Sequence, residues 1–351
     1  MPTCGKLVTL AMLIMTGVGT SGQSVQPPAS ASGPAAVESA RDALRREARA
    51  LEPLIRAAWV KRFLQATADL PAVTPRTVFR DEATRTWYAR DTANKLTESK
   101  RSALRPTELD ERTYYNTKYG TPLAYARPLD VLAEHGLADV AGKRILDFGY
   151  GTIGHLRLLA VLGADVVGVD VDTFLPALYT EPADVGAIKG RHGRDGRITL
   201  VHGRFPAEPH VLRAVDAGYD VFISKNTLKN GYLHPARPVD RRMLIDLGVS
   251  DEKFVREVHR VLKPGGLAII YNICPAPAPE DKPYIPWADG HSPFSREQWQ
   301  AAGFRIRAFD VSDDQAVRAQ ARALGWDEGP EPMDLEKDLF AWFTIVEKPA
   351  P

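Results

Sequence analysis

The stretch that decides the fold runs from Ile145 to Gly154 and reads ILDFGYGTIG. Its first half is an apolar run that predicts a buried strand, and its second half is a glycine-rich turn that opens a helix. Gly149 permits a tight turn that a side chain would obstruct, Gly151 lets the backbone approach a ligand closely, and Gly154 allows the helix to pack against the strand. This G-x-G-x-x-G spacing is a weak signal by itself in a chain with 27 glycines, so its surroundings decide its meaning.

A second strand follows the glycine loop and ends on an acidic residue. The run Asp165–Asp170 is rich in valine, and Asp170 at its end can accept hydrogen bonds from both hydroxyls of a ribose. Asp172 is the alternative for that role, and an ordinary turn or capping aspartate is the competing interpretation of Asp170. Together the strand, the loop, the helix and the acidic strand end favour a site for an adenosine-containing cofactor.

Short β-branched runs alternate with helical stretches throughout the chain from residue 143 onward. The predicted strands are Arg144–Phe148, Asp165–Asp170, Ile198–His202, Tyr219–Ser224, Leu267–Asn272, Phe304–Asp310 and Phe340–Val346. Such alternation predicts an α/β fold with a mostly parallel sheet and helices on both of its faces.

The residue that separates two kinds of cofactor is Asp147, two positions before the first glycine of the loop. A dinucleotide needs bare backbone amides and a helix N-terminus against its pyrophosphate, and a carboxylate at the strand end would repel that anion. S-adenosylmethionine has no phosphate and carries a sulfonium and an ammonium, which a nearby carboxylate stabilises. Asp147 therefore favours the sulfonium cofactor.

Several segments resemble the ordered motifs of one family. They are Ile145–Gly154, Asp170, Tyr219–Asn226, Arg260–Leu267, Ser295–Trp299 and Ala302–Phe304. Over roughly residues 143–347 the chain resembles the class I S-adenosylmethionine-dependent methyltransferases. The resemblance implies a Rossmann-like sheet of seven strands with the last one antiparallel, donor binding at the carboxyl ends of the strands, and methyl transfer. The donor-binding roles that it implies fall on Asp147, Gly149, Gly151 and Asp170 and, more loosely, on Lys225 and Asn226.

An aromatic and amide-rich run, Tyr114–Thr121, lies just upstream of this region. Aromatic faces attract cations, including a sulfonium, so Tyr119 is expected to cap the donor, although packing of the preceding segment explains it equally well. The complete candidate set for donor binding is Asp147, Gly149, Gly151, Gly154, Asp170, Lys225, Asn226 and Tyr119.

Two segments beyond the predicted strand ends are candidates for binding the methyl acceptor. One is Lys225–His234, and the other is the proline-rich loop Cys274–Phe294, which we expect to act as a lid. His234 and His291 are candidate general bases, because an unperturbed histidine titrates near pH 6.5, while a surface hydrogen-bonding role suits either one. A methyl sulfonium is already activated, so no metal is needed. The acceptor itself is not defined by the sequence, and a small molecule is one option.

The first 22 residues have the pattern of a secretory signal or short hydrophobic anchor. Lys6 precedes the uncharged run Leu7–Val18, and small residues follow. The run is shorter than the roughly 20 apolar residues that a bilayer span needs, so no transmembrane span is expected. Export, for example to a periplasm, is the expectation, and a cytoplasmic location is the alternative if the start codon is misassigned. The remaining segments are a disordered linker (23–34), a helical N-terminal extension (35–136) and the methyltransferase domain (137–351).

The amino-acid composition excludes several classes of function. Lys and Arg number 45 against 44 Asp and Glu, and a net charge of +1 gives no reason to expect nucleic acid as a partner. Two cysteines, Cys4 and Cys274, are too few for a disulfide scaffold, a zinc finger or an iron–sulfur cluster. The rival functions are an NAD-dependent oxidoreductase with the same glycine pattern and a non-catalytic exported protein that retains the fold.

Overall fold

The computed structural model of the protein describes residues 38–191 and 193–350. Its centre is an eight-stranded sheet with the strand order β10-β11-β9-β8-β4-β5-β7-β6. The strands are β4 Arg144–Phe148, β5 Asp165–Asp170, β6 Gly186–Ile188, β7 Gly196–His202, β8 Tyr219–Lys225, β9 Leu262–Cys274, β10 Arg305–Ser312 and β11 Phe340–Glu347. All seven predicted strands are present, and the short edge strand β6 is an addition that the sequence did not predict.

The pairing of the strands confirms a mostly parallel sheet. β4 pairs in parallel with both β5 and β8, and β5 with β7 and β8 with β9 continue this direction. The last strand, β11, is antiparallel to both of its neighbours, β9 and β10. This is the arrangement that the resemblance implies.

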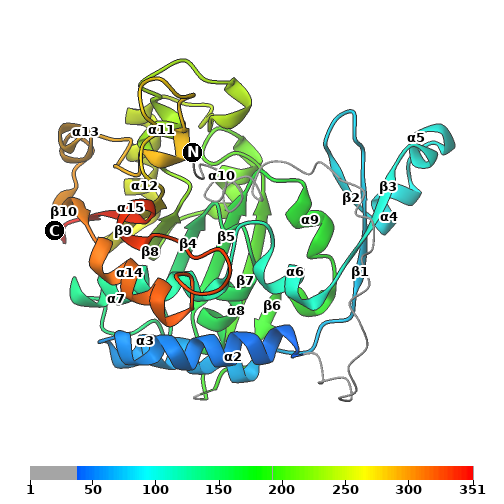
Figure 1. Ribbon diagram of the computed structural model, residues 1–351, viewed down its shortest axis with the longest axis horizontal. Helices are drawn as coiled ribbons and strands as arrows, with labels where there is room; N and C mark the ends of the chain where they lie inside the picture. Colours follow the sequence, from blue (N-terminus) through cyan, green and yellow to red (C-terminus); the bar gives the residue numbers. More distant parts are fainter. Residues whose placement is uncertain (1–37, 192, 351) are drawn as a thin grey trace.

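Helices cover both faces of the sheet, as predicted (Figure 1). Neighbouring residues of β4 alternate between two cores, with Ile145 in one and Leu146 and Phe148 in the other. The helices after the glycine loop are α8 Gly154–Val161, α9 Phe174–Leu178, η4 Pro182–Asp184, α10 Pro209–Val215, α11 Asn230–Leu233, η5 Arg241–Met243, α12 Asp251–Val261, η6 Pro286–Ala288, α13 Arg296–Ala301, α14 Asp314–Ala323 and α15 Leu335–Asp338.

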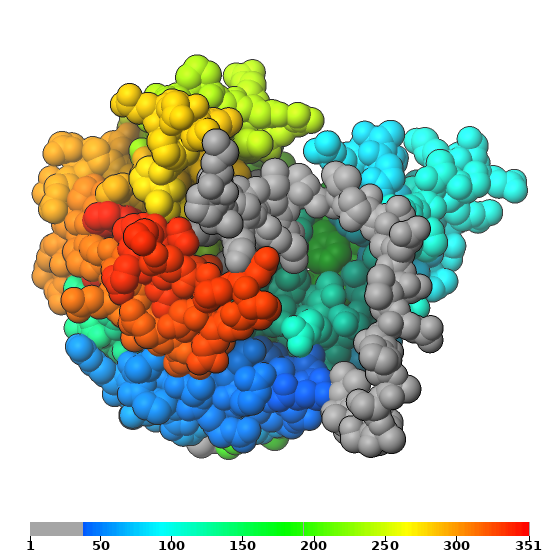
Figure 2. Space-filling model, in the orientation of Figure 1, coloured from blue at the N-terminus to red at the C-terminus, as the bar shows by residue number. Residues whose placement is uncertain are grey.

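The described part of the N-terminal extension combines helices with a small sheet. Its helices are α2 Ala40–Leu51, η1 Glu52–Leu54, α3 Ala58–Gln65, η2 Ala66–Asp69, α4 Arg90–Asn94, α5 Glu98–Ser102, α6 Glu111–Asn116, η3 Pro122–Tyr125 and α7 Ala126–Glu134. Strands β1 Arg76–Arg80, β2 Trp87–Ala89 and β3 Arg105–Leu109 form an antiparallel sheet in the order β2-β1-β3, which the sequence did not predict. This sheet and α4 and α5 project from the rest of the molecule (Figure 2).

The extension and the large sheet share one core. Leu51 and Phe63 of the extension belong to the same buried cluster as Ile145 of β4 and Leu158 of α8. The buried carboxylate of Asp130 on α7 strengthens the assembly, because it accepts a hydrogen bond of 2.8 Å from the backbone amide of Ala57. The extension therefore covers one face of the sheet and brings its own side chains to the glycine loop.

The predicted signal segment (1–22) and linker (23–34) lie outside the described residues. Within the described part of the chain, we find no helix with the length and apolar character required to cross a bilayer.

Candidate functional site

The candidate site lies where strands β4, β5 and β8 end together. Because β4 pairs in parallel with both other strands, their carboxyl ends meet at one edge of the sheet. The chain leaves β4 toward α8 and β5 on one side, while β8 lies on the other side, so this edge is a topological switch point (Figure 1). Ligands of open α/β sheets bind at such points.

The glycine loop has the conformation that its sequence predicts. Gly149 and Gly151 have φ values of +75° and +58°, in the left-handed region that favours glycine. A methyl group added at Gly151 would lie 2.8 Å from Cβ of Tyr119, and one at Gly149 would collide with the side chain of Thr227. The extension and the end of β8 therefore both approach the loop at these glycines.

The reason predicted for Gly154 is wrong. A methyl group added at this first residue of α8 would lie 2.8 Å from Cβ of Pro122 and 2.9 Å from the backbone oxygen of Tyr115. Both neighbours belong to the extension and not to the strand. Gly154 therefore permits the close approach of the extension to α8.

Asp147 lies in a fully buried polar cluster. Its Oδ2 atom hydrogen-bonds Nε2 of His155, while its Oδ1 atom is buried without a hydrogen-bond partner among the described residues. The ring of Tyr125 stacks on the His155 ring, with centroids 3.5 Å apart and an interplanar angle of 6°. Burial lowers the pKa of His155, and burial together with Asp147 raises the pKa of Tyr125. Both neighbours of the carboxylate are thus held neutral.

Sequence reasoning missed His155 and Tyr125. His155 follows Gly154 directly and stands in an otherwise largely apolar helix, which was a usable signal. Tyr125 comes from the extension, and no local pattern connects it to Asp147, which is 22 positions later in the chain.

Asp170 and Asp172 hold the turn that follows β5. Asp170 accepts hydrogen bonds from the amides of Gly151 (3.2 Å) and Asp172 (2.9 Å), and burial raises its pKa to about 6. The Oδ2 atom of Asp172 accepts a 2.6 Å hydrogen bond from the Tyr119 hydroxyl and lies 2.7 Å from Nζ of Lys118. Burial alone would raise the pKa of Asp172, but the ammonium of Lys118 and the hydrogen bonds from Tyr119 and the Phe174 amide together outweigh it, and the pKa is lowered. Tyr119 therefore lies against both the glycine loop and the acidic turn.

Lys225, the last residue of β8, and Asn226, the residue after it, lie in different environments. The side chain of Asn226 accepts a 2.7 Å hydrogen bond from the amide of Ile273 and so ties β8 to β9. Lys225 is 8 % exposed, and its Nζ lies 5.4 Å from the centre of the Tyr125 ring. Burial lowers the pKa of Lys225 to about 8. Of the two, Lys225 points into the polar cluster.

The predicted lid, Cys274–Phe294, packs against the segment that contains α11. Nζ of Lys229 donates to the backbone oxygens of Ile273 (2.6 Å) and Trp287 (3.1 Å), and the amide side chain of Asn230 donates to Asp289 (2.7 Å). The two candidate acceptor-binding segments are therefore fastened to each other.

Neither candidate histidine joins the cluster around Asp147. Nε2 of His234 lies 2.9 Å from the carboxylate of Asp251 on α12, with 45 % of its side chain exposed. Nδ1 of His291 lies 2.8 Å from Asp289, and this hydrogen bond raises the pKa of His291. Within the described residues, neither histidine hydrogen-bonds or ion-pairs with Asp147, and no group of three or more His, Cys, Asp or Glu could hold a metal ion.

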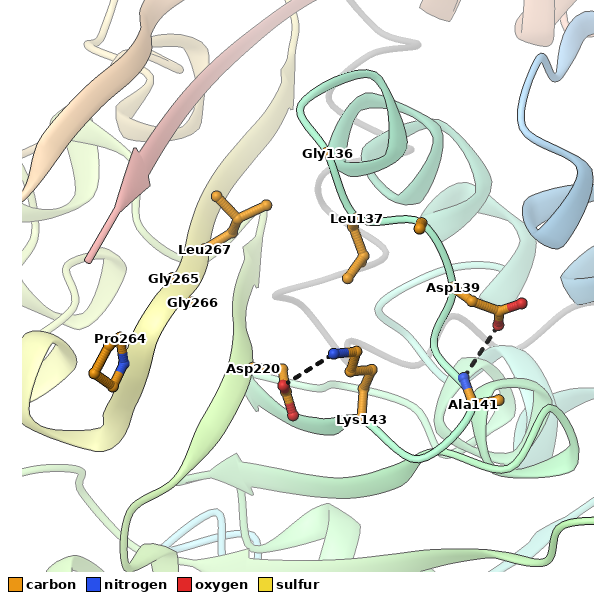
Figure 3. Close-up of a pocket in the computed structure, with 11 residues that line it drawn as sticks. Gly136, Leu137, Asp139, Ala141, Lys143, Asp220, Pro264, Gly265, Gly266 and Leu267 are labelled. Atoms are coloured by element: carbon orange, nitrogen blue, oxygen red, sulfur yellow. Dashed lines mark hydrogen bonds and ion pairs between the residues drawn. The ribbon is translucent and has the colours of Figure 1, made fainter. Parts of the chain in front are cut away.

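A pocket also exists at the opposite edge of the sheet, where β4, β8 and β9 begin (Figure 3). An ion pair of 3.3 Å between Lys143 and Asp220 crosses it. Because ligands of this fold bind at the carboxyl ends of the strands, the pocket is not the candidate site.

Comparison with known proteins finds similarity among solved structures alone. No protein-family model and no curated protein sequence matches the chain. Among solved structures, an S-adenosylmethionine-dependent methyltransferase from Mesorhizobium loti is 18 % identical, with a TM-score of 0.36, over 64 % of this chain and 97 % of that one. Phosphoethanolamine N-methyltransferase 2 from Haemonchus contortus, in complex with S-adenosylhomocysteine, is 16 % identical, with a TM-score of 0.40, over 70 % and 62 %. The [4+2]-cyclase SpnF is 18 % identical, with a TM-score of 0.37, over 92 % and 100 %.

The strand order, the antiparallel last strand and the glycine loop define a Rossmann-like α/β fold, with the strand arrangement that the resemblance to class I methyltransferases implies.

Proposed function

We propose that the protein is an S-adenosylmethionine-dependent methyltransferase. The observation that carries the proposal is the buried Oδ1 atom of Asp147, which has no hydrogen-bond partner among the described residues. A buried carboxylate oxygen without a partner is costly, and a cationic ligand at the glycine loop would remove that cost. The ammonium of the donor is such a group, whereas a pyrophosphate is not.

The side chains at the strand ends have the hydrogen-bonding groups that S-adenosylmethionine requires. Asp147 would accept a hydrogen bond from its ammonium, and Asp170, at the end of β5, would accept from the ribose hydroxyls. Gly149 and Gly151 keep the backbone bare at the loop, and Tyr119 offers an aromatic ring beside it.

The donor supplies an activated methyl group when it is bound. The residues of the chain therefore have to align donor and acceptor and keep water away. The buried cluster around Asp147 and the loop Cys274–Phe294, which Lys229 fastens, support both tasks, because they place buried polar groups near the carboxyl ends of the strands. We further propose that the acceptor, a small molecule among the options, binds between this loop and the end of β8.

Titration calorimetry of the full-length chain with S-adenosylmethionine, S-adenosylhomocysteine and NAD tests the function. We expect both sulfur compounds to bind and NAD not to bind. Asp147→Asn should weaken binding of S-adenosylmethionine by about 10- to 100-fold, since a hydrogen bond to a charged group contributes about 1.5–3 kcal/mol.

Asp251→Asn is the matched control, because it also breaks an Asp–His pair but does so at the start of α12, outside the site. Binding of NAD without binding of either sulfur compound would support the oxidoreductase instead. A folded protein that binds none of the three would support a non-catalytic role.

We also propose export of the chain, on the pattern of residues 1–22 alone. Cell fractionation with an antibody against the C-terminal domain tests this: a shortened chain outside the cytoplasm is expected. A full-length chain in the cytoplasm would argue for a misassigned start.

A further inference from the structure

Lys225 is a largely buried lysine whose Nζ makes no hydrogen bond and no ion pair with the other described residues. It is 8 % exposed, and among the described residues no carboxylate and no hydrogen-bond acceptor lies within bonding distance of its Nζ. Its surroundings consist of the face of the Tyr125 ring, the charge of Asp147 and the repulsive charge of Lys229. Since a buried ammonium without a partner is unfavourable, the neutral amine becomes accessible near physiological pH.

Lys229, four residues later, is a buried lysine with a structural role in the same region. It is 3 % exposed, and burial lowers its pKa to about 8, as for Lys225. However, its Nζ donates to the backbone oxygens of Ile273 and Trp287, so its hydrogens are committed to holding the loop after β9. The nitrogen of Lys225 has no such commitment, and its lone pair is free when the amine is neutral.

The position of Lys225 places this nitrogen at the edge where methyl transfer would occur. It lies two residues beyond Ile223, the register partner of Asp147, and its strand ends beside the glycine loop. Side chains that alternate along a strand put Ile223 and Lys225 on the same face. That face is the one on which Asp147, His155 and Tyr125 form their cluster.

The Tyr125 ring adds a feature that suits the product of methylation. An aromatic face stabilises a nearby cation, and it does so for an alkylated ammonium that has few hydrogen bonds to lose. An N-methylated Lys225 would keep its charge over this ring while having fewer unsatisfied N–H groups than the unmodified ammonium.

We propose that Nζ of Lys225 is itself a methyl acceptor, so that the protein methylates its own chain at this residue; the inference rests on the proposed function. The lone pair of the neutral amine attacks the methyl carbon and forms an N–C bond. The bond between that carbon and the sulfonium breaks, and its electron pair stays on sulfur. The products are S-adenosylhomocysteine and an N-methylammonium on Lys225, and no other reactant is needed.

The test is incubation of the purified full-length chain with S-adenosylmethionine that carries a CD₃ group, followed by peptide mass spectrometry. Fragmentation spectra assign the label to Lys225 or to Lys229, four residues away, which is an internal control. Lys225→Arg is the matched variant, since it keeps a cation but removes the nucleophile. Thermally unfolded protein, incubated in parallel, measures unspecific methylation.

We expect the label on Lys225, none on Lys229, and none at this position in the Arg variant. The initial rate of labelling should rise about tenfold between pH 7 and pH 9, because the neutral fraction of an amine that titrates near pH 8 rises from about 0.09 to about 0.91. Label on Lys229 or an equal yield in unfolded protein would overturn the inference.

Calorimetry on the same sample separates the two proposals. If S-adenosylmethionine binds but Lys225 stays unlabelled, self-methylation is wrong and the proposed function stands. If the donor does not bind, the proposed function fails, and self-methylation fails with it.

Discussion

Two buried polar clusters lie between the large sheet and the extension, and they differ in how completely their groups are paired. In the first, Arg127 donates to both oxygens of Asp313 at 2.7 and 2.9 Å, and the Tyr271 hydroxyl donates to the same carboxylate at 2.8 Å. Asp130, beside Arg127, is bonded to a backbone amide as well. Each of these carboxylates has partners from more than one element, so this cluster holds α7, β9 and α14 together.

The second cluster contains Asp147, His155, Tyr125 and Lys225, and several of its atoms have no hydrogen-bond partner among the described residues. Oδ1 of Asp147 and Nδ1 of His155 are buried in this state, and Nζ of Lys225 lies over the face of the Tyr125 ring without a hydrogen bond or ion pair to another described residue. Buried polar groups are normally satisfied, and exceptions call for an explanation. The contrast indicates that the first cluster serves the fold and the second serves a ligand.

The strongest way to break the comparison is Arg127→Leu. The substitution leaves Asp313 and Asp130 buried beside an uncharged side chain, so we expect a loss of about 3–5 kcal/mol in the free energy of unfolding. Urea denaturation measures it. Arg305→Leu is the control, because Arg305 has 57 % of its side chain exposed and pairs with Glu347 at 3.7 Å, where about 1 kcal/mol or less is expected. Equal losses of unfolding free energy in both variants would contradict the stabilising role of the cluster around Arg127.

Lys225→Met tests the second cluster through the pH dependence of stability. Lys225 loses its proton near pH 8 in the folded chain and near pH 10.4 in the unfolded chain, so the unfolded chain binds more protons between these values. The free energy of unfolding therefore rises with pH in this window. In the Lys225→Met variant, the slope of the unfolding free energy against pH should be smaller by up to about 1.4 kcal/mol per pH unit. Urea midpoints at pH 7.5, 8.5 and 9.5 measure the slope. Lys189→Met, at a side chain that is 87 % exposed, is the control; an unchanged slope in Lys225→Met would refute the prediction.

A smaller effect is expected at Tyr119, which lies against the glycine loop. Tyr119→Ala removes both the ring beside Gly151 and the hydrogen bond to Asp172, and S-adenosylhomocysteine should bind about tenfold more weakly. Tyr119→Phe keeps the ring and should fall between the variant and the wild type. Calorimetry on proteins with matched circular dichroism measures the affinities. If the folded Ala variant binds as tightly as the wild type, Tyr119 does not contact the donor.

The smallest effect is expected for His234→Gln. His234 is half exposed and pairs only with Asp251 among the described residues, so unfolding free energy should change by less than about 1 kcal/mol. Affinity for S-adenosylhomocysteine should not change. A clear loss of affinity would return His234 to the site and weaken the contrast between the two clusters.

The large sheet was predictable because its strands are strongly patterned. Runs such as Val166–Val169 are buried on both faces and need no distant information to be identified. By contrast, β6 has three residues, and the strands of the small sheet carry arginine, proline and glutamate with little alternation. Short or polar strands are defined by their pairing partners and not by their own composition.

The sequence predicted several residues of the candidate site, including the distant Tyr119 and Lys225, but not the contacts that bring them together. The spacing from Asp147 through Gly151 and the position of Asp170 follow from the order of strand, loop and strand. The stacking of Tyr125 on His155 joins segments 30 residues apart, and Lys225 reaches Tyr125 across 100 residues. Such contacts depend on how the extension packs, and no local pattern contains that information.

The continuity of the core across residue 137 has a practical consequence. Leu51 and Phe63 belong to the same buried cluster as Ile145, and Asp130 accepts a hydrogen bond from the connection between α2 and α3. A shortened version that starts at residue 137 would expose this interior and remove Tyr125 and Tyr119 at once. An expressed fragment should therefore begin no later than residue 38, because the segment before the glycine loop forms part of the same core as the large sheet.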